Sequence, residues 1–285
     1  MPKPQVATAV SIPPNLTDAL TTNTAVEICR AIKGIDLDIR SASGTTLIND
    51  VTGQVIYTPP QGETRLRGLL TNWEKFLHDS SGADPFIRMA IAHYQFEAIH
   101  PFSDGRTGRI INLLYLVEQG LLDLPVLYLS RAIIQRKAEY YRLLRAVTAE
   151  QRWEEWILYM LIAVSKTAAW TTAKIRAMRK LIQDTIDYVK GRAPDLYTYE
   201  LIELIFAQPS CRIANLVEAG IAHRQTASVY LKRLCAIDVL EEIKLGREKL
   251  FINPRLMALL KSERYSISPF PGRPEGEGVA NKKAP

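Results

Sequence analysis

The sequence predicts a mainly α-helical protein, in which a helical body with one small β-hairpin is followed by a smaller second domain. Three observations support this prediction. Helical patterns follow one another almost without interruption from residue 64 to about residue 189. A break in the apolar periodicity at residues 191–195, which contains Pro194, indicates a domain boundary. After this break, three short helical patterns precede two alternating segments that are typical of strands.

Length and composition set the broad class. A chain of 285 residues with 47% hydrophobic residues can bury a sizeable core and form more than one domain. Its three cysteines, Cys29, Cys211 and Cys235, show no metal-binding spacing, which predicts a reducing compartment without a disulfide framework. We find no secretion signal and no apolar run that could span a membrane, so we predict a cytoplasmic protein with no membrane partner. The net charge of +6 fits nucleic acid or nucleotide partners and is also ordinary for a soluble protein.

The helical body is predicted to occupy residues 22–190, after a flexible lead-in at residues 1–21 that is rich in Pro, Thr and Ala. A short strand at residues 55–58 lies within the segment 53–62 and is closed by two prolines, which cannot continue a strand ladder. The predicted helices span residues 23–32, 64–78, 85–98, 108–119, 131–146 and 153 to about 189. The last of these is long enough for two helices or one bent helix.

The second domain is predicted at residues 195–262, with a disordered tail at residues 263–285. Its predicted helices span residues 199–207, 212–219 and 224–236, and its strands span residues 240–244 and 249–252. This order resembles a winged helix-turn-helix domain, and residues 246–248 would form the tip of the wing. The side chains that would contact phosphates and base edges are those of Arg224, Gln225, Ser228, Lys232 and Arg247. Because the third helix carries few basic groups, and because winged helices also bind proteins, DNA binding and protein binding both stay open.

The stretch from His100 to Arg109, which reads His-Pro-Phe-Ser-Asp-Gly-Arg-Thr-Gly-Arg, is the centre of the predicted site. It lies between a helix that Asp84 should cap and a helix that is apolar on nearly every side. A helix N-terminus with glycine-freed N–H groups and arginines favours anions. A histidine and a carboxylate beside it suggest a base and a Mg²⁺ ligand. Taken singly, the histidine could simply interact with the last carbonyls of its helix, and the aspartate could be the cap of the next one.

This stretch also resembles the signature of the Fic (Fido) proteins, which transfer AMP from ATP to protein hydroxyls. The resemblance covers roughly residues 53–189, and a winged helix is a common C-terminal companion in that family. It implies that His100 is the catalytic base and that Asp104 holds Mg²⁺. The residues that it implies for nucleotide binding around the motif are Gly105, Arg106, Thr107, Gly108 and Arg109.

Two further sets of residues follow from the same resemblance. In Fic proteins a hairpin called the flap lies over the active site and aligns the target protein, a role that would fall here to Val55, Ile56, Tyr57 and Thr58. A plain surface hairpin is the alternative interpretation. Tyr140 and Tyr141 match a tyrosine pair that lines the adenine pocket in that family. Packing on the helical bundle is an equally good interpretation for either tyrosine.

The chain departs from the family pattern in two places. Family members usually carry Asn-Gly where Gly105 is here followed directly by Arg106. The loss of two residues shortens the reach of the loop by up to about 7 Å. We therefore predict a shortened phosphate-binding loop that impairs transfer. An inhibitory helix of the pattern Ser/Thr-x-x-x-Glu-Gly/Asn has no match before the motif, and the nearest candidate, Glu27, has Asn23 four residues earlier.

The function predicted from the sequence is therefore a protein adenylyltransferase of the nucleotidyltransferase class, impaired by its short loop, that uses ATP and Mg²⁺. Its partner would be a protein with a Ser, Thr or Tyr hydroxyl. The alternative is a catalytically silent nucleotide-binding or DNA-binding regulatory protein that acts through the winged helix. The sequence fixes neither the target protein nor the nucleotide transferred, and it leaves a homodimer open.

Overall fold

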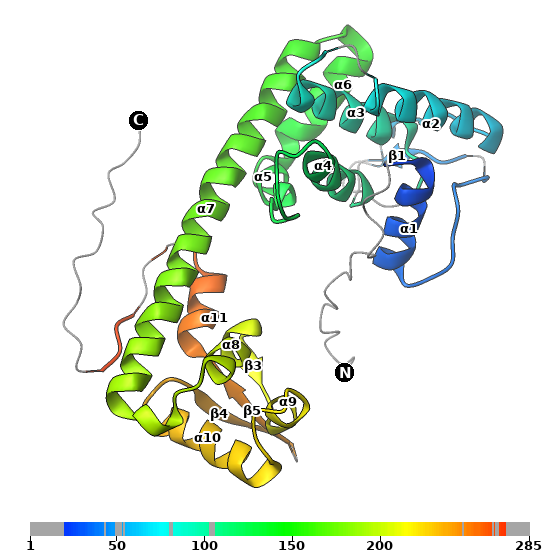
Figure 1. Ribbon diagram of the computed structural model, residues 1–285. Coiled ribbons are helices and arrows are strands. Elements are labelled where there is room, and N and C mark those ends of the chain that lie inside the picture. The colour runs from blue at the N-terminus through cyan, green and yellow to red at the C-terminus, as the bar shows by residue number, and fades with distance from the viewer. Residues whose placement is uncertain are drawn as a thin grey trace. The chain divides into compact units, whose positions relative to one another are not determined.

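The computed structural model describes residues 20–42, 44–48, 53, 55–79, 82–102, 106–246, 248–263, 265 and 268–271. The chain divides into two compact units, Met1–Thr171 and Thr172–Pro285 (Figure 1). This division falls within the long helix α7 (Trp153–Arg192), whose end lies at the predicted break at residues 191–195. The predicted fold class, mainly helical with small antiparallel sheets, is confirmed. The domain limits inferred from the sequence stay predictions.

The first unit is a helical bundle with one small hairpin (Figure 1). Its helices are α1 (Thr22–Lys33), α2 (Glu63–Leu77), α3 (Pro85–Ile99), α4 (Thr107–Glu118), α5 (Leu129–Gln135), α6 (Lys137–Glu150) and the first part of α7. The hairpin is formed by β1 (Leu47–Ile48) and β2 (Val55–Tyr57), which pair antiparallel.

Capping residues fix where the first helices begin and end. Thr21 caps α1 in a reciprocal pair with Thr24, and Gly34 ends the helix at a φ of 68° that glycine adopts without strain. Asp84 caps α3 as predicted, because its carboxylate accepts hydrogen bonds from the N–H groups of Phe86 and Ile87 at 2.8 and 3.3 Å. The predicted lead-in at residues 1–21 is wrong at its end, since Leu20 is buried and Thr21 is the cap. Residues 1–19 lie outside the described residues.

The core of the first unit lies around two buried tryptophans. Trp73 on α2 donates its indole N–H to the carbonyl of Ala92 at 3.1 Å, and Trp156 on α7 donates to Ala90 at 2.8 Å. Each tryptophan therefore buries a large apolar ring, and its one polar atom, the indole nitrogen, keeps a hydrogen-bond partner. Since both acceptors belong to α3, these contacts hold α3 at the centre of the bundle.

The structure differs from the predicted helices and strands in three places of the first unit. The hairpin has a first strand, β1, that the sequence did not reveal, and β2 ends at Tyr57, one residue before the predicted end. The single helix predicted at residues 131–146 is two helices, because Arg136 leaves the helical region at φ −123° and ψ 40°. The long C-terminal segment of the body is one continuous helix of 40 residues.

The second unit contains the rest of α7, a 3₁₀ turn at Pro194–Leu196, and a small helical and β-sheet module (Figure 1). Its further elements are α8 (Tyr199–Ala207), β3 (Ser210–Cys211), α9 (Ile213–Glu218), α10 (Arg224–Ala236), β4 (Glu241–Leu245), β5 (Glu248–Ile252) and α11 (Pro254–Lys261). The sheet is antiparallel with the order β3-β5-β4, and Phe251 of its central strand is fully buried. The order of helices and strands matches the predicted winged helix, with β3 and α11 as elements that the sequence did not reveal.

Part of the predicted disordered tail is packed against this unit. Phe270 is buried and stacks on Tyr188, with 4.4 Å between ring centroids. Arg255 lies over the same ring at 4.0 Å and donates to the carbonyls of Ser268 and Pro269. The prediction of a disordered segment at residues 263–285 is therefore wrong for residues 268–270, because an aromatic ring and an arginine hold them. Residues 272–285 lie outside the described residues.

None of the helices in the described part of the chain has both the length and the apolar character that crossing a membrane requires.

Candidate functional site

The candidate site is built where α3 ends and α4 begins. α3 ends at His100, whose backbone adopts a left-handed conformation at φ 50° and donates its N–H to the carbonyl of Phe96 at 3.0 Å. Phe102 is buried against Phe96, with ring centroids 6.2 Å apart, which anchors the chain just after the histidine. Residues 103–105 lie outside the described residues, so Asp104 and Gly105 have no described placement.

The first turn of α4 presents the other half of the motif. Arg106 is its exposed N-cap, and its carbonyl accepts hydrogen bonds from the N–H groups of Arg109 and Ile110 at 3.1 and 3.2 Å. Thr107 and Gly108 are buried, and Arg109 is half-buried. The first N–H groups of a helix need partners outside the helix, and its positive end attracts anions. The start of α4, with two arginines, is therefore suited to hold phosphate groups.

Gly108 lets α4 approach α3 closely. A methyl group at this position would lie 2.7 Å from a carboxylate oxygen of Glu97 and 3.1 Å from the ring of Phe96. It would also lie 3.5 Å from the ring of His93. This glycine therefore has a packing role, in addition to the phosphate-binding role that the sequence implied.

His93 is a buried histidine that the sequence did not single out. Its Nε2 shares a 2.8 Å hydrogen bond with the hydroxyl of Tyr140, and its ring stacks parallel to that of Trp156. Burial, reinforced by the nearby positive charge of Arg109, lowers the pKa of His93 to about 3. The ring is therefore neutral at physiological pH, which allows the guanidinium of Arg109 to lie beside it without charge repulsion.

The two tyrosines of the predicted adenine pocket have different environments. Tyr140 is buried among His93, Trp156 and Tyr159, and burial raises its pKa well above the usual value. Its ring is thus part of the core of the bundle. Tyr141 leaves half of its side chain exposed and packs edge-on against Tyr140 at 5.3 Å. Of the pair, Tyr141 is the exposed one, and the ammonium of Lys137 lies over its ring at 5.8 Å.

The hairpin is attached to the end of α3 that carries His100. The hydroxyl of Tyr57 donates to the carbonyl of Ala98 at 2.8 Å, and burial raises the pKa of this tyrosine. Val55 and Ile56 precede it in β2 and are largely exposed, whereas Thr58 lies just beyond the strand. Because the described sheet has two strands, β2 has one edge without a strand partner, and such an edge can accept an extended peptide.

Arg40 joins the hairpin to the histidine. Its side chain donates to the carbonyls of His100 at 2.7 Å, Ile99 at 3.3 Å and Pro60, and its own N–H donates to Pro101 at 3.0 Å. One guanidinium thus contacts both the base of the hairpin and the C-terminal end of α3. Burial lowers its pKa, against the opposing effect of Tyr57, although an arginine stays charged in any case.

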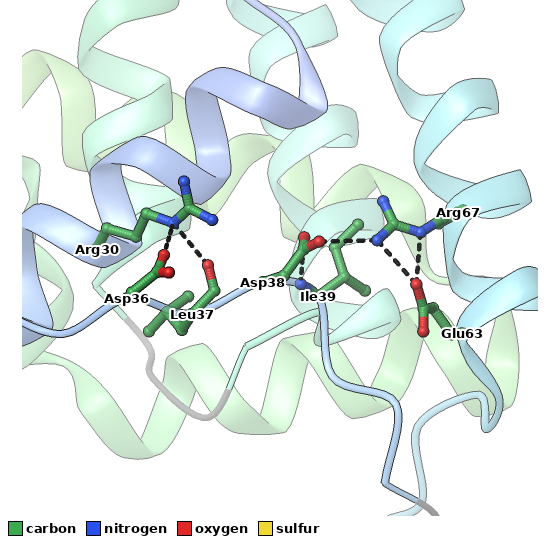
Figure 2. Close-up of polar contacts among 7 residues, drawn as sticks. All are labelled: Arg30, Asp36, Leu37, Asp38, Ile39, Glu63 and Arg67. Atoms are coloured by element: carbon green, nitrogen blue, oxygen red, sulfur yellow. Dashed lines mark hydrogen bonds and ion pairs between the residues drawn. The ribbon is translucent and has the colours of Figure 1, made fainter.

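A set of surface ion pairs fixes the segment that leads to Arg40, as Figure 2 shows. Arg30 of α1 contacts the carboxylate of Asp36 at 3.0 Å and the carbonyl of Leu37 at 2.7 Å. Arg67 of α2 contacts Asp38 at 2.9 Å, and the backbone N–H of Ile39 together with Arg67 lowers the pKa of Asp38. Two helices therefore hold the four residues that precede Arg40.

No group of three or more His, Cys, Asp or Glu side chains that could hold a metal ion occurs among the residues that the structure describes. Mg²⁺ at phosphate sites is commonly bound by one or two carboxylates together with phosphate oxygens, so a single protein carboxylate is a suitable donor. Asp104, the predicted ligand, lies outside the described residues, and in the sequence it stands between the described residues Phe102 and Arg106.

The predicted DNA-contacting residues lie on or after α10. Arg224, Gln225 and Lys232 are exposed on this helix, and Ser228 is half-buried. Arg247, at the predicted tip of the wing, lies outside the described residues. The helix has Ala227, Leu231 and Leu234 in the core, and contact of its polar side chains with DNA stays a prediction.

Comparison with known proteins identifies both parts of the chain. Residues 20–116 match the model of the Fic/DOC family, and residues 181–256 match that of the "Protein adenylyltransferase SoFic-like, C-terminal domain". The chain therefore contains a Fic domain. It is 36% identical over 91 residues to the Protein adenylyltransferase fic-1 of Caenorhabditis briggsae, a match that covers 30% of this chain and 16% of that protein.

A solved structure with a related chain is that of a Fic family protein from Desulfovibrio desulfuricans G20. It has a TM-score of 0.47 and 20% sequence identity, and the match covers 82% of this chain and 69% of that chain.

Three residues near the site of this Fic domain were missed in the sequence, namely Arg40, His93 and Glu97. Each lies outside the motif, and Arg40 is separated from His100 by 60 positions. A signal for Glu97 and His93 existed in their helical spacing, since they lie three and seven residues before His100 on the same helix. No pattern in the sequence indicated Arg40, because its acceptors are main-chain carbonyls that any residue type supplies.

Glu27, the nearest candidate for an inhibitory glutamate, is exposed on α1 of this Fic domain. Its carboxylate accepts a 2.9 Å hydrogen bond from the side chain of Asn23, four residues earlier on the helix.

Proposed function

We propose that this protein transfers AMP from ATP to a hydroxyl group of a target protein. The observation that supports this most directly is the arrangement of the motif. His100 is held at the end of α3 through its own carbonyl, and six residues further along the chain Arg106 is the N-cap of α4. A base and an anion-binding helix start that lie close together in the sequence would supply the two groups that in-line attack on a phosphate requires.

In this proposal each residue has one task. His100 takes the proton of the Ser, Thr or Tyr hydroxyl as its oxygen attacks the α-phosphate of ATP. The bond from the α-phosphorus to the oxygen that bridges to the β-phosphate breaks, and pyrophosphate leaves. Arg106 and Arg109, with the N–H groups from Gly105 to Gly108, bind the phosphate oxygens and stabilise the negative charge in the transition state. Asp104 would hold Mg²⁺, whose charge offsets that of the phosphates. Tyr141 would stack on the adenine, and the edge of β2 would align the target chain.

The test is the transfer of labelled AMP by the full chain, with Mg²⁺ present, to itself and to the proteins of a cell lysate. His100→Ala and His100→Asn should both abolish labelling. Asn is the matched variant, since it tolerates the left-handed backbone of this position better than alanine does. Both variants should unfold at nearly the temperature of the parent. Labelling that persists in both variants would exclude His100 as the base.

The missing Asn-Gly pair supports a second experiment. Inserting Asn-Gly between Gly105 and Arg106 should restore the phosphate-binding turn. Since one lost donor of the oxyanion type is typically worth about 3 kcal/mol, the rate of transfer should rise by at least about 10²-fold. ATP binding by the parent without any transfer, either before or after the insertion, would favour the catalytically silent nucleotide-binding protein.

A further inference from the structure

A cavity of about 60 Å³ lies in the first unit, between α5 with the following residue Arg136 and α7. On the same measure one water needs about 10–15 Å³, so the cavity has room for a small polar group. The polar residues that line it are Arg131, Gln135, Arg136, Lys166 and Thr167. None of these residues belongs to the motif or to the hairpin. Arg136 was described above only as the residue that separates α5 from α6.

The lining is strongly basic. Arg131 lies over the ring of Trp170 at 4.5 Å, and Arg136 lies over the ring of Tyr159 at 5.1 Å. These ring contacts orient the two guanidinium groups. Arg136 is also paired with Glu139 on α6. Lys166 is exposed and, among the described residues, has no carboxylate within ion-pair distance. The lining thus combines three cations, of which Arg136 is paired with Glu139.

A buried hydroxyl group lies in the same lining. Thr167 is 1% exposed, and its Oγ1 has no hydrogen-bond partner among the residues that the structure describes. Buried hydroxyls nearly always find a partner, because leaving one unpaired is unfavourable. In a helix a threonine usually satisfies itself by bonding a carbonyl one turn back, which Thr167 does not do. A ligand with an acceptor oxygen in the cavity would supply the missing partner.

We propose that this cavity binds the phosphate group of a small phosphomonoester. Two guanidinium groups, an ammonium, a hydroxyl and the amide of Gln135 offer more donors than the two oxygens of a carboxylate can accept. The three terminal oxygens of a phosphate group suit such a set, and planar guanidinium groups bind them in pairs. This site is separate from the residues proposed for AMP transfer and does not depend on that function.

The experiment is a calorimetric titration of the full chain with inorganic phosphate at low chloride concentration. The parent should bind at one saturable site. Lys166→Ala should weaken binding by about tenfold or more, as expected for a charge-assisted hydrogen bond. Thr167→Val, which keeps the shape of the side chain, should weaken it by about fivefold. Arg145→Ala is the matched control, because Arg145 is exposed on α6 outside the cavity, and it should bind like the parent.

Two further arms separate this site from its alternatives. Arg106→Ala should keep the phosphate affinity of the parent, whereas a loss in this variant alone would place the phosphate at the start of α4 and overturn the proposal. Acetate should not compete, and equal competition would show a carboxylate site instead. Absence of saturable heat in the parent, or equal affinity in the Lys166→Ala and Thr167→Val variants, would also overturn it. Unchanged thermal unfolding of both variants without phosphate shows that they are folded.

Discussion

Arg40 illustrates how a single side chain can hold a site together without touching a substrate. Its acceptors are the carbonyls of Ile99 and His100, at the end of α3, and of Pro60, after the hairpin. Carbonyls at the end of a helix have no partner within the helix, so they need one from elsewhere. Arg40 supplies it, and in doing so it fixes the backbone from which the imidazole of His100 projects.

Arg40→Ala should therefore destabilise the first unit. Loss of a charged donor from several buried carbonyls typically costs about 2 kcal/mol, since those groups are left without a partner. Arg67→Ala is the control, because the ion pairs that the structure describes for its side chain, with Asp38 and Glu63, are exposed, and their loss should change stability little. Urea unfolding of the full chain measures both. Equal midpoints for the two variants would contradict the role given to Arg40.

His93 should make the stability of the first unit depend on pH. Its pKa is about 3 in the folded chain, against about 6.5 for a histidine in water, so the unfolded chain takes up the proton first as the pH falls. Stability is then complete above about pH 6.5 and is lost progressively between 6.5 and 3. The free energy of unfolding should fall by up to about 1.4 kcal/mol per pH unit within that window.

The measurement is urea unfolding at a series of pH values from 7.5 down to about 5, above the range in which most carboxylates titrate. His93→Gln keeps a neutral side chain that can bond Tyr140 but cannot titrate, and it should remove most of the slope. If the parent and this variant lost stability in parallel, the pH dependence would have to come from another group.

At the scale of helices, the approach of α4 to α3 depends on Gly108. Gly68→Ala on α2 offers a matched comparison, because a methyl group there meets nothing within 4 Å. It should stabilise the chain by about 0.5–1 kcal/mol, through the usual preference of helices for alanine. Gly108→Ala should be less stable than Gly68→Ala by about 1–3 kcal/mol, because its methyl group meets the ring of Phe96 at 3.1 Å. Thermal unfolding compares the two, and a difference near zero would mean that α3 and α4 move apart easily.

The elements with strong local signals were predictable from the sequence. α3 is located by its cap, Asp84, and α10 by its apolar spacing, and both lie within about two residues of the predicted ranges. β1 could not be predicted, because it has two residues and exists only through its pairing with β2. The break at Arg136 was hidden for a similar reason, since the residues on both sides of it favour helix.

Of the candidate site, only the residues that lie close together in the sequence could be predicted. The motif located His100 and the start of α4, since both lie in one short stretch. The sequence could not reveal that Tyr57 and Arg40 bond the end of α3, because these contacts join residues 41 and 60 positions apart. It also could not separate the environments of Tyr140 and Tyr141, because neighbouring helix positions face different sides and burial depends on what packs there.

At the scale of the whole molecule, the chain joins a Fic domain to a SoFic-like C-terminal domain. The chain carries a net charge of +6, and two of its basic residues, Arg224 and Lys232, are exposed on α10 in the second unit. Positive charge of this kind attracts any polyanion at long range. If α10 is the DNA-binding helix, individual side chains on its exposed face must contribute to the affinity for DNA.

If α10 contacts DNA, the full chain should retard a duplex at low salt, and its affinity should fall steeply as salt is added, because each phosphate contact releases counterions. Arg224→Ala and Lys232→Ala should each weaken binding and each lower the salt slope by about 1. Arg247→Ala at the predicted wing should act in the same way. Lys180→Ala on α7 is the control, since Lys180 is paired with Asp184 and lies away from α10 in the sequence. Equal losses in all four variants would show a general charge effect, because a specific face should respond only to its own residues. No retardation of the duplex by the parent would leave protein binding as the role of this domain.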